Sequence, residues 1–166
     1  MEVIPVSVEA TKRVMDAYLS ALTNRGDFGQ FFTDNVSWTT IETGDRFEGR
    51  EAVRDFITTF HTQLFDAHPE VKSLAIGDGI VALEADFVGT HTGEFAGIAP
   101  TSASLRVPYA VFYEVADDGI KALRAYMPIS RMVADCSSFH GVPELAAGPR
   151  EQITGSEHFG ARDEDQ

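Results

Sequence analysis

Four β-like runs in the second half of the chain restrict the fold more than any other feature. They are rich in β-branched and aromatic residues and cover residues 71–76, 80–91, 104–115 and 120–127. The sequences "GDG" and "DDG" lie between the first and second runs and between the third and fourth. Short turns of this kind join neighbouring antiparallel strands, so the pattern predicts an antiparallel meander.

Three helical segments precede this meander. Ser7 is placed to cap the first helix, whose apolar residues recur with helical spacing until Gly26 ends it. "FGQFF" predicts a short helical turn, and a third helix is expected over 49–70, ended by Pro69. One strand, "VSWTTIET", lies between the second and third helices. Helices segregated from an antiparallel sheet define an α+β protein, here a strongly curved sheet wrapped over three N-terminal helices.

Composition limits the partners and the chemistry. The 166 residues suffice for one domain, and the net charge of −13 disfavours nucleic acid and anionic membranes as partners. The single cysteine excludes an internal disulfide, and no histidine pair with a carboxylate has metal-ligand spacing, so neither metal nor cofactor is expected. Without a signal peptide or a membrane-spanning run, the protein is expected to be cytoplasmic. Helical and strand periodicity is lost near Ala134, so we expect a domain over 1–133 and a loosely structured tail over 134–166.

A curved sheet over helices leaves an apolar interior, which is the expected site for a small hydrophobic molecule. Alternation along the strands and helical spacing give the candidate lining. The residues expected to face the cavity are Trp38, Thr40, Phe56, Phe60, Tyr109, Val111, Tyr113, Ala125 and Met127.

The motif "GTHTGEFAGIAPT" at residues 89–101, together with the order of the elements, resembles the SnoaL-like polyketide cyclases. The resemblance covers about residues 8–132. These cyclases belong to the nuclear-transport-factor-two-like superfamily, with the ketosteroid isomerases and limonene epoxide hydrolases. The resemblance implies a cone-shaped α+β barrel, often a homodimer, that acts on hydrophobic carbonyl or epoxide compounds without a cofactor.

The active residues of these relatives are only partly matched. The cyclase acid/base aspartate falls on Ala125, and its histidine falls at or next to Val111. The isomerase tyrosine that binds an oxyanion falls on Tyr18. The epoxide hydrolase arginine and aspartate fall on Glu84 and Asp86.

We therefore predict an enzyme that cyclises or isomerises a hydrophobic, polyketide-like carbonyl compound. Tyr18 would stabilise an enolate oxygen, and Asp86 or His91 would move the proton. Each residue has a structural alternative: Tyr18 in the core, Asp86 facing solvent, and His91 stabilising the exit from its strand, the alternative that we favour for His91. Two other functions stay open, namely epoxide opening through Asp86 and binding of a small molecule without catalysis.

Overall fold

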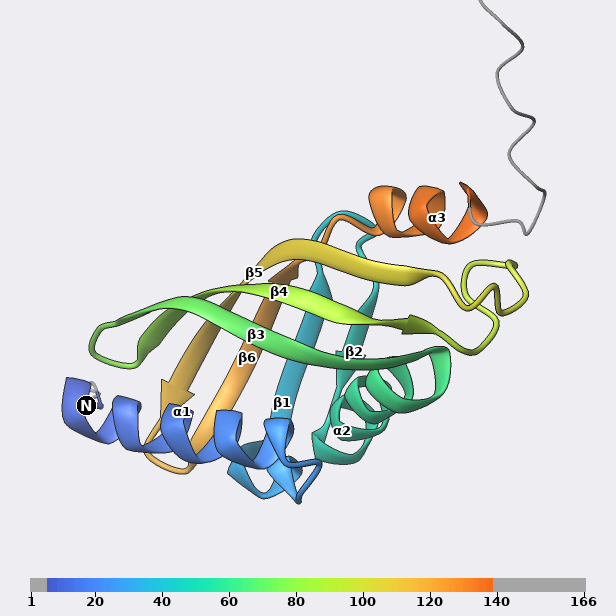
Figure 1. Cartoon of the computed structure of the whole chain (residues 1–166). Helices are drawn as coiled ribbons and strands as arrows, with labels where there is room; N and C mark the ends of the chain where they lie inside the picture. The colour runs from blue at the N-terminus through green and yellow to red at the C-terminus, as the bar shows by residue number, and fades with distance from the viewer. Residues whose placement is uncertain (1–5, 139–166) are drawn as a thin grey trace, which may run out of the picture.

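The computed structural model describes residues 6–138, and Figure 1 shows a long, curved sheet with helices beneath its concave side. The elements follow in the order α1 (Val8–Thr23), 3-10 helix η1 (Phe28–Phe31), β1 (Phe32–Thr40), β2 (Arg46–Glu48), α2 (Arg50–Thr59), π-helical turn η2 (Phe60–Leu64), β3 (Phe65–Ile76), β4 (Ile80–His91), β5 (Ser104–Ala116), β6 (Gly119–Tyr126) and α3 (Ile129–Ser138).

The six strands form one open sheet in the order β2-β1-β6-β5-β4-β3. Strands β3 to β6 make the expected antiparallel meander, and the α+β class is confirmed. One pair departs from the expected antiparallel pattern: β1 runs parallel to β6, with Trp38 opposite Leu123. Because β1 lies between helices in the chain, it enters the sheet beside the last strand and makes the sheet mixed.

The third helix is shorter than predicted. α2 ends at Thr59, the π-helical turn occupies residues 60–64, and β3 already begins at Phe65. Pro69 lies within β3, opposite Phe87, instead of ending a helix. β3 is an edge strand, where the missing N–H of a proline costs no hydrogen bond with a neighbouring strand. Pairing with the whole length of β4 thus outweighs the helical pattern of 60–68.

Two turn glycines allow the meander to fold tightly. Gly79 has a φ of +71°, and Gly119 has a φ of +135°. A Cβ on Gly119 would lie 2.4 Å from the Phe31 carbonyl oxygen. Any larger residue would therefore separate the β5–β6 turn from the start of β1.

Regular structure continues past the expected boundary at residue 133. α3 extends through Ser138, and its Met132 and Cys136 side chains are fully buried. The Glu42 carboxylate accepts hydrogen bonds from the Ser130 backbone and hydroxyl at the start of this helix. The domain therefore includes α3, whose apolar face contacts β5, away from α1 and α2 (Figure 1). The remainder of the expected tail, 139–166, lies outside the described residues. Within residues 6–138, every helix is too short or too polar to cross a bilayer.

Candidate functional site

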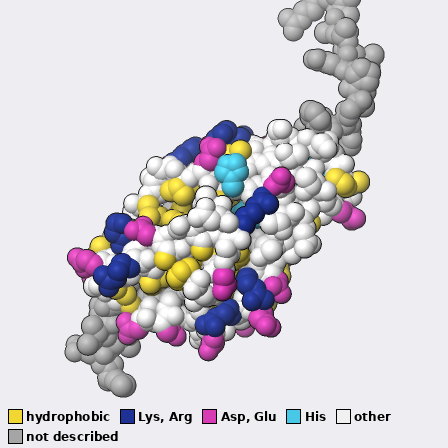
Figure 2. All heavy atoms as spheres, turned by 60° about the horizontal axis from the view of Figure 1, so that its bottom comes forward, with side chains coloured by type: hydrophobic (Ala, Val, Ile, Leu, Met, Phe, Trp, Pro, Cys, Tyr) yellow, Lys and Arg dark blue, Asp and Glu magenta, His cyan; other side chains and the backbone are white. Residues whose placement is uncertain are grey.

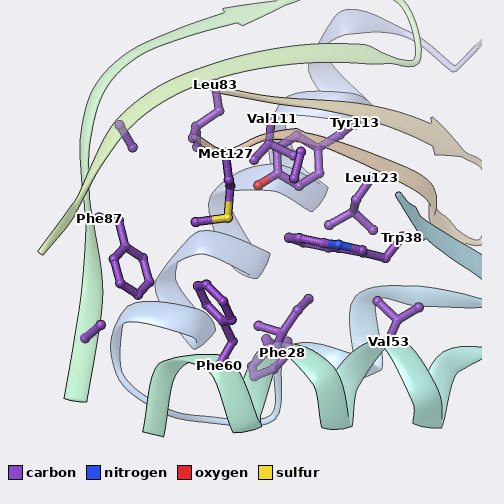
Figure 3. Packing of buried hydrophobic residues seen from close by; sticks show 14 of the residues in the cluster. Phe28, Trp38, Val53, Phe60, Leu83, Phe87, Val111, Tyr113, Leu123 and Met127 are labelled. Atoms are coloured by element: carbon purple, nitrogen blue, oxygen red, sulfur yellow. The ribbon is translucent and has the colours of Figure 1, made fainter. Parts of the chain in front are cut away.

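A narrow cavity lies between the concave face of the sheet and the helices beneath it. Its wall consists of Tyr18, Leu22, Trp38, Phe56, Ile57, Phe60, His61, Phe87, Tyr109, Val111, Tyr113 and Met127. Figure 3 shows the Tyr113 hydroxyl directed toward Met127, in the space enclosed by Trp38, Phe60 and Phe87. Seven of the lining residues are aromatic, and none is an aspartate, glutamate, lysine or arginine. The site is thus largely apolar, and three tyrosine hydroxyls and one imidazole are among its few polar groups.

The cavity is small, and a second hollow adjoins it. The inner cavity has a free volume of about 30 Å³, enough for about two water molecules. The adjoining outer hollow has about 120 Å³. Leu22, Ile57 and His61 line both spaces and form the partition between them.

Tyr18 and Tyr113 form a hydrogen-bonded pair in the inner cavity. Tyr18 is 2% exposed, and its hydroxyl shares a hydrogen bond with that of Tyr113. Burial raises the pKa of Tyr18, of Tyr113 and of Tyr109, so all three phenols stay protonated at neutral pH. One O–H of this pair is used between the two phenols, so the other is available to donate to a ligand.

His61 is the ionisable base of the cavity wall. Its Nδ1 lies 2.8 Å from the Ile57 carbonyl oxygen, which can only accept, so Nδ1 carries the proton. In the neutral ring Nε2 is therefore a hydrogen-bond acceptor. Burial lowers the pKa of His61, and the nearby Arg25 guanidinium lowers it further. The imidazole is thus neutral near pH 7 and able to take up a proton.

Trp38 presents its ring to the cavity because its N–H is bound elsewhere. The indole Nε1 donates to the Thr40 hydroxyl at 2.9 Å, a buried contact. Thr40 and Ala125 were both expected to face the cavity, but both lie behind its wall, where they pair across β1 and β6. The other seven residues expected in the wall are found there.

Asp86 lies on the opposite side of the sheet from the cavity. β4 directs Leu83, Ala85 and Phe87 inward, so Asp86 faces outward. Its carboxylate is 2.8 Å from Lys72 Nζ and 3.0 Å from Arg106 Nη1. These hydrogen bonds, that of Lys72 foremost, lower the pKa of Asp86. Asp86 therefore does not line the cavity, and its position gives no support to Asp86 as a proton carrier there or to epoxide opening through Asp86.

His91 is fully buried but does not line the cavity. Its Nδ1 accepts hydrogen bonds from the Thr101 backbone N–H (3.2 Å) and hydroxyl (3.0 Å). The His91 backbone also bonds to Ala103 and Ser102. These hydrogen bonds connect the end of β4 to the segment just before β5. They agree with the alternative that His91 stabilises the exit from its strand. The assignment of His91 as a proton carrier is not supported by this position.

His61 was not among the residues expected in the cavity, and the structure places it in the cavity wall. Its distance of four residues from Ile57 is the signal that was present, since such residues share a helix face. The π-helical turn that carries His61 has no comparable sequence signature. Turns of this kind occur often at functional sites. Among residues 6–138, no three His, Cys, Asp or Glu side chains are grouped to hold a metal ion.

The family model of the SnoaL-like polyketide cyclases matches residues 12–128, and the chain belongs to this family. No curated protein sequence matches the chain significantly. A family of this kind indicates a small-molecule enzyme of the cyclase or isomerase type.

Solved structures share the fold at low sequence identity. A Jannaschia sp. CCS1 protein assigned to the SnoaL-like polyketide cyclases has a TM-score of 0.71 and 15% identity, covering 83% of this chain and 98% of its own. A Catenulispora acidiphila protein with a ketosteroid isomerase-like fold, in complex with trimethylamine, has a TM-score of 0.62 and 18% identity, over 76% and 94%. An epoxide hydrolase of the LEH-like type from M. tuberculosis has a TM-score of 0.59 and 16% identity, over 76% and 89%.

Proposed function

We propose that the protein catalyses proton transfer at the carbon next to a carbonyl group, leading to isomerisation or cyclisation of a hydrophobic compound. One observation carries the proposal. A neutral imidazole with a free acceptor nitrogen and a tyrosine hydroxyl with a free proton line the same apolar cavity. Enolate chemistry needs these two groups, a base for the C–H and a donor for the oxygen.

The proposed reaction uses His61 as the base and Tyr18 as the donor. His61 Nε2 takes the proton from the α-carbon, and the electrons of the broken C–H bond move to the carbonyl oxygen. Tyr18 stabilises the resulting oxyanion, and Tyr113 positions and polarises Tyr18 through its own hydrogen bond. The protonated imidazole then returns the proton to another carbon in an isomerisation. In an aldol cyclisation the enolate carbon attacks a second carbonyl, and the new alkoxide takes the proton.

The apolar wall supports this assignment. Hydrogen bonds to a developing charge are stronger where water is excluded, and the lining contains no ionised group that would compete for the oxyanion. The Ile57 carbonyl fixes the His61 tautomer without a carboxylate partner. The cavity therefore supplies acid/base chemistry even though the aspartate and histidine positions of the cyclases hold Ala125 and Val111.

Hydrogen–deuterium exchange in D₂O tests the proposal before the natural substrate is known. Small aromatic and unsaturated cyclic ketones would be incubated with the protein, and exchange at the α-carbon followed by NMR. We expect Tyr18→Phe to lower the exchange rate by about 10²–10³-fold. His61→Gln, which keeps a polar side chain but removes the base, should lower it by about 10²–10⁴-fold.

Two outcomes would contradict this function. If both variants exchange at the wild-type rate, the proton carriers lie elsewhere. If ketones bind, as reported by the fluorescence of Trp38, and none exchanges, the protein is a binding module without catalysis. Ser130→Ala, far from the cavity at the start of α3, is the control that should exchange normally.

A further inference from the structure

The outer hollow differs in chemistry from the inner cavity. It lies between the end of α1 and the end of α2, and its wall consists of Leu22, Arg25, Gly26, Phe28, Ile57, Thr58, His61 and Thr62. Arg25 is the one lysine or arginine of this wall, and no aspartate or glutamate belongs to it. The hollow therefore combines an apolar floor with one cation and two threonine hydroxyls.

The two spaces adjoin each other across shared side chains. The inner cavity has room for about two water molecules, too little for a whole hydrophobic carbonyl compound, whereas the outer hollow is about 120 Å³ against about 30 Å³ for the inner cavity. Their common partition consists of three side chains, Leu22, Ile57 and His61. A substrate whose carbonyl lies beside His61 in the inner cavity must therefore extend past this partition into the outer hollow.

Arg25 can bind a ligand without losing its present partner. Its Nη2 lies 2.5 Å from Asp66 Oδ1, and both side chains are more than half exposed. A guanidinium has five N–H donors, so a second carboxylate can bind its free edge or replace the exposed Asp66. Figure 2, with the helical side turned forward, shows acidic and basic side chains intermixed over this face of the molecule.

From this arrangement, and resting on the proposed function, we infer that the substrate is an amphiphile. Its hydrophobic carbonyl end occupies the inner cavity, and a carboxylate at its other end binds Arg25 in the outer hollow. The outer hollow has one cation and the whole chain is acidic, so the site suits a ligand with one carboxylate better than a polyanion. The binding site for the distal group is thus the Arg25 side of the hollow, with Thr58 and Thr62 beside it.

A matched pair of ligands tests this inference through Trp38, the single tryptophan of the chain, which lines the inner cavity. The pair is 5-oxohexanoate and its neutral N-methylamide, which share a small methyl ketone and the chain length. Affinities would be measured from the fluorescence change for the wild type, Arg25→Gln, Arg25→Lys and Arg46→Gln. Arg46 is the matched control, because it is also paired with a carboxylate and its side chain is 55% exposed, against 56% for Arg25.

We expect the wild type to bind the carboxylate about tenfold more tightly than the amide, as a charge-assisted hydrogen bond allows. Arg25→Gln should reduce this ratio to about one, Arg25→Lys should restore part of it, and Arg46→Gln should leave it unchanged. Equal affinities in the wild type, an unchanged ratio in Arg25→Gln, or no fluorescence response to either ligand would overturn the inference. Failure of the proposed function is distinguishable, because ketone exchange would then be absent while the Arg25-dependent ratio remained.

Discussion

The two faces of β4 give neighbouring residues opposite environments. Phe87 points into the aromatic cavity, where burial raises the pKa of the tyrosines and lowers that of His61. Asp86, the residue before it, points to the outer face, where Lys72 and Arg106 keep it ionised. The apolar inner face disfavours charged side chains, whereas ion pairs between charged side chains stabilise the outer face.

This difference shows why a carboxylate in the strand does not identify the base. An ionised carboxylate is stable where cations pair with it, as Lys72 and Arg106 do with the 6% exposed Asp86 on the outer face. The inner face suits groups that are neutral at pH 7 and become charged only during reaction, such as imidazole and phenol. In this chain those groups come partly from the helices, His61 from η2 and Tyr18 from α1.

The largest expected effect is on the stability of the inner face. Phe60 contacts the rings of Phe56, Phe65, Phe87 and Phe95. Phe60→Ala should lower the free energy of unfolding by about 3–5 kcal/mol, as is typical of large-to-small changes in a core. Urea denaturation measures this loss, with Phe60→Leu as the milder control. A loss below about 1 kcal/mol would mean that the inner face tolerates a cavity and is not tightly packed.

On the outer face, the exposed aromatic pair Phe112 and Tyr126 leads us to propose a homodimer. Their rings are 5.7 Å apart, and Ile80 on β4 is also exposed on the sheet. Phe112→Glu should raise the dimer dissociation constant by about tenfold or more, because it places a charge in an apolar contact. Sedimentation at several concentrations measures it. A wild-type monomer at micromolar concentration would remove the proposal.

The pH profile of α-carbon exchange tests the environment of the inner face through the pKa shifts of His61 and Tyr18. The pKa of His61 lies below its ordinary value of 6.5, so its basic form, and α-carbon exchange with it, should persist to pH values below about 6.5. Burial raises the pKa of Tyr18 above 10, so no loss on the basic side is expected below about pH 10. Folding stability should also fall as pH drops below 6.5, because the unfolded chain takes up the His61 proton first. A midpoint of the exchange rate above pH 7 would contradict this environment.

The smallest expected effect is that of Asp86→Asn on catalysis. Because the carboxylate faces away from the cavity, the α-carbon exchange rate should stay within about twofold of the wild type. The substitution leaves Lys72 and Arg106 without this anionic partner, so a loss of thermal stability should appear instead, and only at pH values where Asp86 is ionised. A large loss of exchange at unchanged stability would mean that the outer face contributes to the reaction.

Much of the fold could be predicted because strand alternation and turn glycines are local signals. The β4 and β5 strands and the helix ending near Gly26 follow from them. The end of the third helix could not be predicted, because residues 60–68 satisfy a helical pattern and only pairing with β4 decides between the two structures. The parallel β1–β6 pair is likewise a long-range choice that no local pattern encodes.

The candidate site could be predicted where alternation along a strand decides which side chains face the cavity. Tyr109, Val111 and Tyr113 line the cavity because they share one face of β5. For Asp86 the same alternation predicted the outer face, and the likeness to epoxide hydrolases suggested otherwise. His61 was not among the expected lining residues, although its place four residues after Ile57 puts both on one face of the helix.

The β1–β6 pair described above also sets the order in which the chain can acquire its cavity. Trp38 and Leu123 are neighbours in the sheet, so the wall at Trp38 is complete only when the last strand has joined. Contacts between distant parts of a chain form slowly, because loop closure must precede any gain from them. On the ribosome, Trp38 therefore emerges well before Leu123, its neighbour in the last strand. Completion of the cavity wall is thus expected as a late step of folding.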